Sequence, residues 1–338
     1  MNDSASKKRA AFLSFTPRGS RLAHAAADLL KDDWEAEAFA PKGDLMELTA
    51  HLFSQCDALI FVGACGIAVR AIAPCVAAKT SDPAVIVMDE GGSNVISLLS
   101  GHIGGANELT RALAEGLGAN PVITTATDVN GRFSVDAWAA KNGMKIDSME
   151  LAKLFSVRIL GEDLPLYSEF PIDGELPTGV YLAYAGKLGA AVTFRTIHPF
   201  VRTLRLVPKV LHIGIGCRRG TQAQTIEKAV SEILAEMDLD ASAVADVSSI
   251  DVKADEQGLL EFCASRGWPS RFFTAEELMA AAGDFSASEF VRQTVGVDNV
   301  CERAAVVASG GGKLIVRKTS QNGVTIAAAL EDRRISFE

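Results

Sequence analysis

Two short apolar segments constrain the fold of this chain more than any other feature. Ala58–Val62 (ALIFV) and Ala84–Met88 (AVIVM) are continuous apolar runs of strand length. A glycine turn, Gly63–Gly66, follows the first run, and Asp89 and Glu90 follow the second. Apolar runs of this length between turn residues indicate buried strands, and helical patterns separate them, which is typical of a parallel α/β sheet.

The first third of the chain continues this alternation. Further strands are predicted at Ala10–Phe15 and Val122–Thr125. Ser20 is the expected cap of a helix that ends near Leu30, and a second helix begins near Ile67 and stops or bends at Pro74. Gly105–Leu117 has helical spacing and ends at Gly118. These segments predict an N-terminal α/β domain over residues 1–128.

Residues 129–206 do not continue the regular alternation of strand and helix patterns, and we interpret them as a small middle domain. Helices are predicted at Val135–Asn142 and Ser148–Val157, before the proline-containing stretch Gly161–Thr178. The β-prone segments that follow are Val180–Ala183, Ala190–Phe194 and Val201–Leu206.

Residues 207–338 restart the alternation and predict a C-terminal α/β domain. Its expected strands are Val210–Ile215, Val244–Ile250, Ser270–Phe273 and a terminal pair at Lys313–Lys318 and Gly323–Ala328. Its expected helices start at the capping-box pattern Thr221-x-x-Gln224, at Glu256 and at Val300. The predicted fold class is therefore α/β, with two three-layer α/β/α domains of mainly parallel sheets joined by a small α+β middle segment.

Charge and cysteine usage restrict the classes of partner. The formal net charge is -9, so we expect no nucleic-acid partner, because phosphate binding needs a basic face. The six cysteines form no C-x-x-C pair, which is typical of free thiols in a reducing compartment. No apolar run reaches membrane-spanning length and no signal-peptide core is seen, so we expect a cytoplasmic protein with no membrane partner.

Glycines and titratable side chains are concentrated in Asp89–Thr110, DEGGSNVISLLSGHIGGANELT. Further glycine turns occur at Gly63–Gly66 and Gly214–Gly220. Glycine allows the backbone to approach a ligand closely, so these turns predict a binding or catalytic pocket. The G-x-G-x-x-x-G spacing at Gly214 departs from the dinucleotide-binding pattern and is weak support for a nucleotide.

Several stretches together resemble one family. They are GACGIAVRAIAP (Gly63–Pro74), VIVMDEGGSNVISLLSGHIGGANELT (Val85–Thr110), VITTATD (Val122–Asp128), GIGCRRGT (Gly214–Thr221), SSIDVKADEQGLLEF (Ser248–Phe262), GVDNVCERAA (Gly296–Ala305) and LIVRK (Leu314–Lys318). The chain is identified from them as a member of the cobalt-precorrin-5A hydrolase family of anaerobic cobalamin (vitamin B12) biosynthesis. The Gly-His-x-Gly-Gly-Ala-Asn run is the specific part of this resemblance.

The resemblance implies an activity and a substrate. Members of the family open a δ-lactone on a cobalt-bound macrocycle and release acetaldehyde. The implied substrate is an anionic cobalt-tetrapyrrole that carries its own cobalt, so we expect no additional cofactor and no protein-bound metal. The sequence leaves open both transient contacts with other enzymes of the cobalamin pathway and a homo-oligomeric state.

Three residues are our candidates for proton transfer. Glu90 is the first choice for general base and Asp89 the second, because both follow a buried strand and ligands bind beyond the carboxyl ends of strands. The alternative is that a carboxylate caps the Gly91–Gly92 turn or a helix after Ser93. His102 is the third candidate, as acid, base or axial cobalt contact; its alternative is a histidine bonded to loop backbone. His212, inside a strand, fits a core residue better.

A larger set is predicted to bind the substrate through backbone amides, hydroxyl and amide side chains, thiols or cations. The set comprises Gly63, Cys65, Gly66, Arg70, Gly91, Gly92, Ser93, Asn94, Ser100, Gly101, Gly104, Gly105, Asn107, Gly214, Gly216, Cys217, Arg218 and Arg219. Lys79 is a further candidate cation. The alternatives are small packing residues for the two cysteines and surface ion pairs for the arginines.

Two rival functions remain open at the level of sequence. One is a non-catalytic carrier that holds a tetrapyrrole intermediate for neighbouring enzymes. The other is a phosphosugar-binding or isomerase-like module, because SLLSGHIGGANELT has the loop-to-helix form of such sites. An assay for acetaldehyde separates the first from an enzyme, and a screen of sugar phosphates tests the second.

Overall fold

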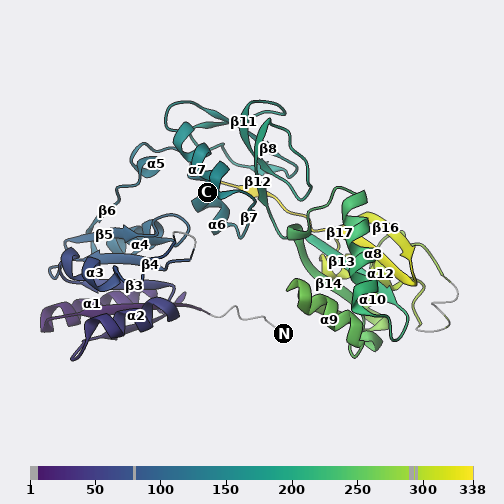
Figure 1. Ribbon diagram of the computed structural model, residues 1–338, viewed down its shortest axis with the longest axis horizontal. Helices are drawn as coiled ribbons and strands as arrows, with labels where there is room; N and C mark the ends of the chain where they lie inside the picture. Colours follow the sequence, from purple (N-terminus) through teal and green to yellow (C-terminus); the bar gives the residue numbers. More distant parts are fainter. Residues whose placement is uncertain (1–6, 79–80, 289–292, 294–295, 338) are drawn as a thin grey trace. The chain divides into compact units, whose positions relative to one another are not determined.

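The computed structural model describes residues 7–78, 81–288, 293 and 296–337 (Figure 1). The chain divides into two compact units, Met1–Ala140 and Lys141–Glu338. The expected boundary at residue 206 lies inside the second unit, so the division into three domains stays a prediction. No helix in the described part of the chain is both long and apolar enough to cross a membrane.

The first unit is built on a six-stranded sheet in the order β2-β1-β3-β4-β5-β6. Its strands are β1 (Lys8–Ser14), β2 (Trp34–Phe39), β3 (Ala58–Val62), β4 (Ala84–Met88), β5 (Asn94–Leu99) and β6 (Asn120–Val122). Its helices are α1 (Pro17–Leu30), α2 (Leu45–Gln55), α3 (Cys65–Ile72), α4 (Ala106–Leu117), α5 (Ala126–Val129) and α6 (Val135–Lys141).

The direction of the strands reverses once in this sheet. Strands β1, β2, β3 and β4 are parallel to one another, β5 runs antiparallel to β4, and β6 is parallel to β5. The carboxyl ends of β1–β4 therefore lie at one edge of the sheet, which we call the Glu90 edge. The carboxyl ends of β5 and β6 lie at the opposite edge, which we call the His102 edge.

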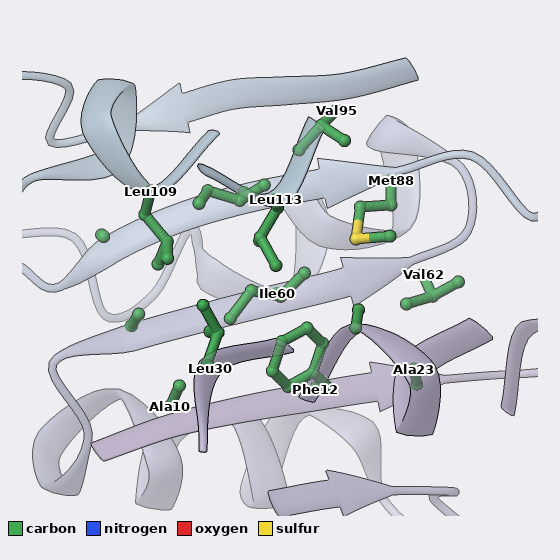
Figure 2. Close-up of a cluster of buried hydrophobic side chains, with 14 of the residues drawn as sticks. Ala10, Phe12, Ala23, Leu30, Ile60, Val62, Met88, Val95, Leu109 and Leu113 are labelled. Carbon is green, nitrogen blue, oxygen red and sulfur yellow. The ribbon is translucent and has the colours of Figure 1, made fainter. Parts of the chain in front are cut away.

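Helices cover both faces of the sheet, which explains why its central strands are apolar on both sides. On one face, side chains of α1 and α4 pack with Phe12, Ile60 and Met88 from three neighbouring strands (Figure 2). Leu113 of α4 lies in the same cluster and is fully buried. On the other face α2 and α3 pack on a second cluster that includes Phe61.

Two predicted helix starts are wrong for local reasons. Helix α1 begins at Pro17 with Thr16 as its cap, whose Oγ1 accepts from the Gly19 amide at 3.0 Å, so Ser20 lies inside the helix. The Thr-Pro pair outcompetes Ser20 because proline is pre-organised for the first helical position. Helix α8 is capped at Gln222 without a side-chain bond, because the Thr221 hydroxyl donates to the Arg218 carbonyl at 2.7 Å.

The sequence-based alternative in which a helix follows Ser93 is also wrong. The segment after Ser93 is strand β5, which pairs with β4 from Met88↔Val95 to Val85↔Leu99. The β-branched Val95 and Ile96 favour this extended conformation.

The second unit contains two five-stranded sheets and one two-stranded pair. The order of the first sheet is β10-β8-β11-β12-β7, with β7 (Lys145–Ile146), β8 (Leu164–Ser168), β10 (Val180–Leu182), β11 (Leu188–Val192) and β12 (Arg202–Val207). Only its β7–β12 pairing is antiparallel, and α7 (Met149–Arg158) packs on β11 and β12. The small pair joins β9 (Ile172–Asp173) and β18 (Ile335–Ser336).

The other sheet of this unit has the order β15-β14-β13-β17-β16. Its strands are β13 (Leu211–Cys217), β14 (Val244–Ile250), β15 (Ser270–Phe273), β16 (Lys313–Gln321) and β17 (Val324–Leu330). The helices around it are α8 (Ala223–Glu236), α9 (Gln257–Arg266), α10 (Ala275–Ala280) and α12 (Val300–Ala308). Strands β13–β15 are parallel and β16 and β17 are antiparallel. The predicted α/β class with mainly parallel sheets is confirmed.

Candidate active site

Asp89 closes the turn between β4 and β5. Its carboxylate accepts hydrogen bonds from the amides of Gly91 at 2.9 Å, Ser93 at 3.3 Å and Asn94 at 2.6 Å. Partial burial opposes ionisation, but these bonds outweigh it and hold the pKa of the carboxyl below its ordinary value. This geometry supports the alternative in which Asp89 caps its own turn.

Glu90, in contrast, is only lightly bonded. Its Oε1 accepts one hydrogen bond, from the Thr16 hydroxyl at 2.7 Å, and its other oxygen has no partner among the described residues. Thr16 follows β1, so the contact joins the ends of two parallel strands at the Glu90 edge. A half-exposed carboxylate with a free oxygen can accept a proton from a bound water or alcohol.

Arg18 lies close to the turn that carries Glu90. A Cβ at position 91 would be 3.5 Å from Arg18 Nη2 and 2.9 Å from Asp89 Oδ1. Gly91 therefore leaves room for the guanidinium of Arg18 against the turn that carries Glu90. The predicted binding glycines Gly91 and Gly92 thus serve the shape of this turn, and Gly92 has a φ of +71° that favours glycine.

The Gly63–Gly66 turn lies at the same edge, between β3 and α3. A Cβ on Gly63 would be 2.9 Å from the Phe15 ring, so this glycine is required by packing. The α3 N-terminus has no side-chain cap, and Arg70 Nη1 donates to the Gly66 carbonyl at 3.2 Å. The predicted Cys65 lies in this first turn and is partly buried. The Glu90 edge thus gathers a carboxylate, cations and uncapped amides.

His102 lies at the opposite edge, in a dense polar network. Its Nε2 is 2.9 Å from Asp128 Oδ2, and its Nδ1 is 3.2 Å from Asp136 Oδ1. Burial works against protonation of the ring, but the hydrogen bonds and charges of these two carboxylates prevail and raise the pKa of the imidazole. Both ring nitrogens are occupied by protein groups, so His102 has neither nitrogen available for a substrate in this arrangement.

The neighbours of His102 are themselves paired. Asp128 also accepts from Asn107 Nδ2 at 3.0 Å and from Arg111. Asn107 in turn accepts from the Ser97 hydroxyl at 2.7 Å and donates to Thr125 at 2.7 Å. Asn107 was a predicted substrate contact; in the structure its amide is used within the network.

The loop that carries His102 is tightly folded. Ser100 has a φ of 57°, which is uncommon for a residue with a side chain, and its buried hydroxyl has no hydrogen-bond partner in the described residues. A Cβ on Gly104 would be 2.4 Å from Ser100 Cβ, and one on Gly101 would be 2.8 Å from Asn107 Oδ1. Gly105 has a φ of 81°. The predicted binding glycines of this loop are therefore explained by its packing and turns.

Glu90 and His102, both predicted candidates for proton transfer, lie at opposite edges of the sheet. Glu90 follows the end of β4, whereas Leu99, just before the His102 loop, pairs with Val85 near the start of β4. A strand of this length separates the two edges by about 13 Å at a rise of 3.3 Å per residue. Each residue does follow the carboxyl end of a strand, but the two strands point in opposite directions.

The predicted glycines of the second unit have packing roles. A Cβ on Gly214 would be 1.8 Å from the Cys301 carbonyl oxygen, so this glycine lets α12 pack directly on β13. A Cβ on Gly216 would be 2.5 Å from Thr325 Oγ1. Burial raises the pKa of the Cys217 thiol, which disfavours a reactive thiolate there.

The two arginines of the GIGCRRGT loop differ. Arg219 Nη1 contacts both carboxylate oxygens of Asp255, at 2.9 and 3.0 Å, in an exposed ion pair. The side chain of Arg218 has no ion-pair partner in the part of the chain that the structure describes. Of the pair, only Arg218 keeps its cation for an anionic ligand.

Two other charged residues of family-like segments support this fold. Lys253 pairs with Glu256 at 3.0 Å, and the second Glu256 oxygen accepts from the Gly220 amide at 2.7 Å, which fixes the GIGCRRGT loop. Glu302 is fully buried and has no ion-pair partner among the described residues; its carboxylate accepts hydrogen bonds from Ser286, Asn299 and the Lys318 amide.

His212 is buried between Asp246 at 3.0 Å and Glu331 at 3.6 Å, which fits a core residue. Lys79 lies outside the described residues.

Several residues important to these two edges are absent from the sequence-based candidates. Thr16 and Arg18 precede Asp89, the start of the candidate segment, by 73 and 71 residues, and only the Thr-Pro helix start marked them locally. Asp128 was within a quoted stretch, and Asp136 had no signal of its own. In the described part of the chain, no group of three or more His, Cys, Asp or Glu residues could hold a metal ion.

Comparison with known proteins identifies the family. Residues 47–128 match the family model "Cobalamin synthesis G N-terminal", and residues 211–329 match "Cobalamin synthesis G C-terminus". The cobalt-precorrin-5A hydrolase of Salmonella typhimurium is 38% identical over 94% of this chain and 96% of that protein. The cobalt-precorrin-5A hydrolase of Priestia megaterium is 35% identical over 88% of this chain and 85% of that protein.

A solved structure is also similar over nearly the full length. The crystal structure of a cobalamin biosynthesis protein G homologue from Sulfolobus solfataricus aligns with a TM-score of 0.44 and 21% identity, over 95% of this chain and 97% of that chain. The identity and coverage of the two bacterial relatives, together with the two family models, show that this chain belongs to the cobalt-precorrin-5A hydrolase family.

Proposed function

We propose that this chain hydrolyses the lactone of cobalt-precorrin-5A, releasing acetaldehyde, with Glu90 as the group that takes the proton. Membership of the hydrolase family supports the reaction. One observation carries the residue assignment: at the carboxyl edge of β1–β4, Glu90 accepts a hydrogen bond from Thr16, and its other oxygen has no partner among the described residues. Asp89, by contrast, has its carboxylate bonded to its own turn.

Lactone opening needs a base and stabilisation of an oxyanion. Glu90 takes a proton from water, and the water oxygen bonds to the lactone carbonyl carbon. The carbon–oxygen bond of the ester then breaks, and the proton passes from Glu90 to the leaving alkoxide. The Thr16 hydroxyl orients the carboxylate, and the nearby Arg18 guanidinium stabilises negative charge on the carbonyl oxygen.

Release of acetaldehyde needs a second proton transfer at the same place. Glu90 takes the proton of the newly formed alcohol, the adjacent carbon–carbon bond breaks, and acetaldehyde leaves. The electron pair of that bond enters the conjugated macrocycle, and the ring carbon then takes the proton from Glu90. The cobalt and the conjugated ring belong to the substrate, so the proposal requires no further cofactor.

The other candidate residues bind the substrate or support the structure around the site. Arg18, Arg70 and Arg218 are our candidates for contacts with the acetate and propionate arms of the substrate, since each guanidinium has no carboxylate partner among the described residues. His102 is reassigned to a positioning role, because both its nitrogens are held by carboxylates. The described cysteines are all free thiols, which supports a cytoplasmic location.

The test is acetaldehyde release from the lactone-form substrate by purified protein, compared with Glu90→Gln. The variant keeps the size and the Thr16 contact of the side chain but removes the base, so turnover should fall by roughly 10²–10⁴-fold while folding is kept. Normal turnover by Glu90→Gln would refute the assignment of Glu90. Tight substrate binding by the wild-type protein without acetaldehyde would favour the carrier instead.

A further inference from the structure

We propose that the second unit binds an anionic tetrapyrrole, the chemical class of the substrate, in a cavity of its own; the choice of ligand rests on the proposed function. The cavity has a volume of about 810 Å³ and is lined by α7, the turn after it, β10 and the starts of β8, β11 and β12. That volume lies within the range of sites for small molecules and cofactors, which are roughly 300–1,000 Å³.

The lining is largely apolar and partly open to solvent. Leu154, Leu164, Pro165 and Leu188 contribute to it, together with Val201, which is 86% exposed. Two of the thirteen exposed large apolar side chains of the described residues, Tyr181 and Val201, line this cavity. Exposed apolar side chains in the wall of a cavity favour a binding site.

Two unpaired cations lie on one side of the cavity. Lys187 precedes β11 and Arg202 begins β12, and the Arg202 amide donates to the Lys187 carbonyl at 2.9 Å. Both side chains line the cavity, and neither has an ion-pair partner in the described part of the chain. Like charges on adjacent strands repel each other, so an anion between them would be stabilising.

The carboxylates of the lining come from a different element. Glu162 and Asp163 belong to the turn after α7, where Glu162 lies 3.7 Å from Arg158 in an ion pair. The cavity therefore combines an apolar interior with one cationic side. An anionic tetrapyrrole has the matching chemistry, because its ring faces are apolar and its carboxylates project from the edge. A sugar phosphate has no such apolar face.

Uroporphyrin, a porphyrin with eight carboxylates, is a suitable probe, and its Soret band reports binding directly. We expect saturable binding to the full chain. The charge reversal Lys187→Glu/Arg202→Glu should weaken binding by at least roughly tenfold, because it removes two charge-assisted contacts. Val201→Glu should have a similar effect, since it places a carboxylate on the apolar wall. Lys187→Gln/Arg202→Gln is the milder version if the first variant does not fold.

Matched controls lie elsewhere in the same unit. Lys313→Glu reverses an exposed charge on β16, and Met279→Glu places a carboxylate on exposed α10. Both should bind uroporphyrin like the wild-type chain. Wild-type affinity in all the cavity variants would overturn the proposal, as would an equal loss in the controls. Unchanged uroporphyrin binding with lost binding of a protein partner would assign the cavity to that partner instead.

The two proposals fail in different ways. Glu90→Gln should bind uroporphyrin normally and lose turnover, whereas the cavity variants should lose affinity for uroporphyrin and keep kcat at saturating lactone substrate. If Glu90→Gln kept its turnover while the cavity variants still lost affinity, only the base assignment would fall. If the cavity variants kept their affinity for uroporphyrin, only the cavity site would fall.

Discussion

The two edges of the first sheet both carry titratable side chains, but these side chains differ in how many hydrogen bonds they already make. At the Glu90 edge a carboxylate oxygen accepts one hydrogen bond, and the other oxygen has no partner in the part of the chain that the structure describes. At the His102 edge every nitrogen of the imidazole contacts a carboxylate, and Asp128 is bonded to three side chains. A group that transfers protons to a substrate needs a hydrogen-bonding position that the protein does not already occupy. The difference therefore favours a catalytic role at the first edge and a structural role at the second.

The reversal between β4 and β5 creates this division. A single segment, Asp89–Thr110, leaves the sheet at one edge, crosses it as β5, and emerges at the other. The two ends of the segment are close in sequence and far apart in space. A concentration of polar residues therefore does not by itself define one site; the number of hydrogen bonds that each group already makes distinguishes the two ends.

The largest expected difference between the edges is in turnover. Glu90→Gln should lower kcat by roughly 10²–10⁴-fold, since it removes the proton acceptor. Asn94→Ala, which alters the adjacent turn without removing a base, should lower it far less. Acetaldehyde production at saturating substrate measures both. A kcat for Asn94→Ala as low as that of Glu90→Gln would show that the shape of the turn, and not the base, limits the reaction.

The next largest effect is on stability, at the other edge. His102→Ala leaves Asp128 and Asp136 without their shared partner in a largely buried site, which should cost on the order of 3 kcal/mol of unfolding free energy. The matched change His51→Ala removes an exposed histidine and should have almost no effect. Urea unfolding measures both. Equal stability of the two variants would contradict a structural role for His102.

The pH dependence of that effect has a definite sign. The folded-state pKa of His102 is raised above its ordinary value of 6.5, so its contribution to stability is complete below pH 6.5 and is lost as pH rises through the raised pKa. The difference in unfolding free energy between wild type and His102→Ala should therefore shrink as the solution becomes alkaline. A difference that grows with pH would indicate a neutral imidazole in the folded state.

These contrasts were only partly predictable from sequence. Ala58–Val62 and Ala84–Met88 were predicted with their observed bounds, because burial on both faces makes a strand continuously apolar. Strand β5 was missed, since Asn94 and Ser97 interrupt its apolar pattern, and its direction is not encoded locally. The Thr16–Glu90 bond joins residues 74 positions apart, which no spacing rule reaches. The sequence therefore predicted which residue types lie near the site, but it did not predict how many hydrogen bonds each of them already makes within the protein.

A smaller effect should separate the two arginines of the second unit. Arg218→Ala should raise KM by roughly tenfold with little change in kcat, because it removes one charge-assisted contact with an anionic arm. Arg219→Ala should leave KM unchanged, since that guanidinium is already paired with Asp255. Steady-state kinetics over a range of substrate concentrations measures both. A larger rise in KM for Arg219→Ala than for Arg218→Ala would show that Asp255 releases Arg219 to the substrate.

Chemical rescue tests the division between the two edges most directly. Glu90→Ala and His102→Ala are each assayed for acetaldehyde release with and without added formate or imidazole. A general base at position 90 predicts that formate restores turnover to Glu90→Ala, because the small carboxylate occupies the vacated space. Imidazole should restore no turnover to His102→Ala. Rescue of His102→Ala by imidazole, with no rescue of Glu90→Ala by formate, would place the chemistry at the opposite edge.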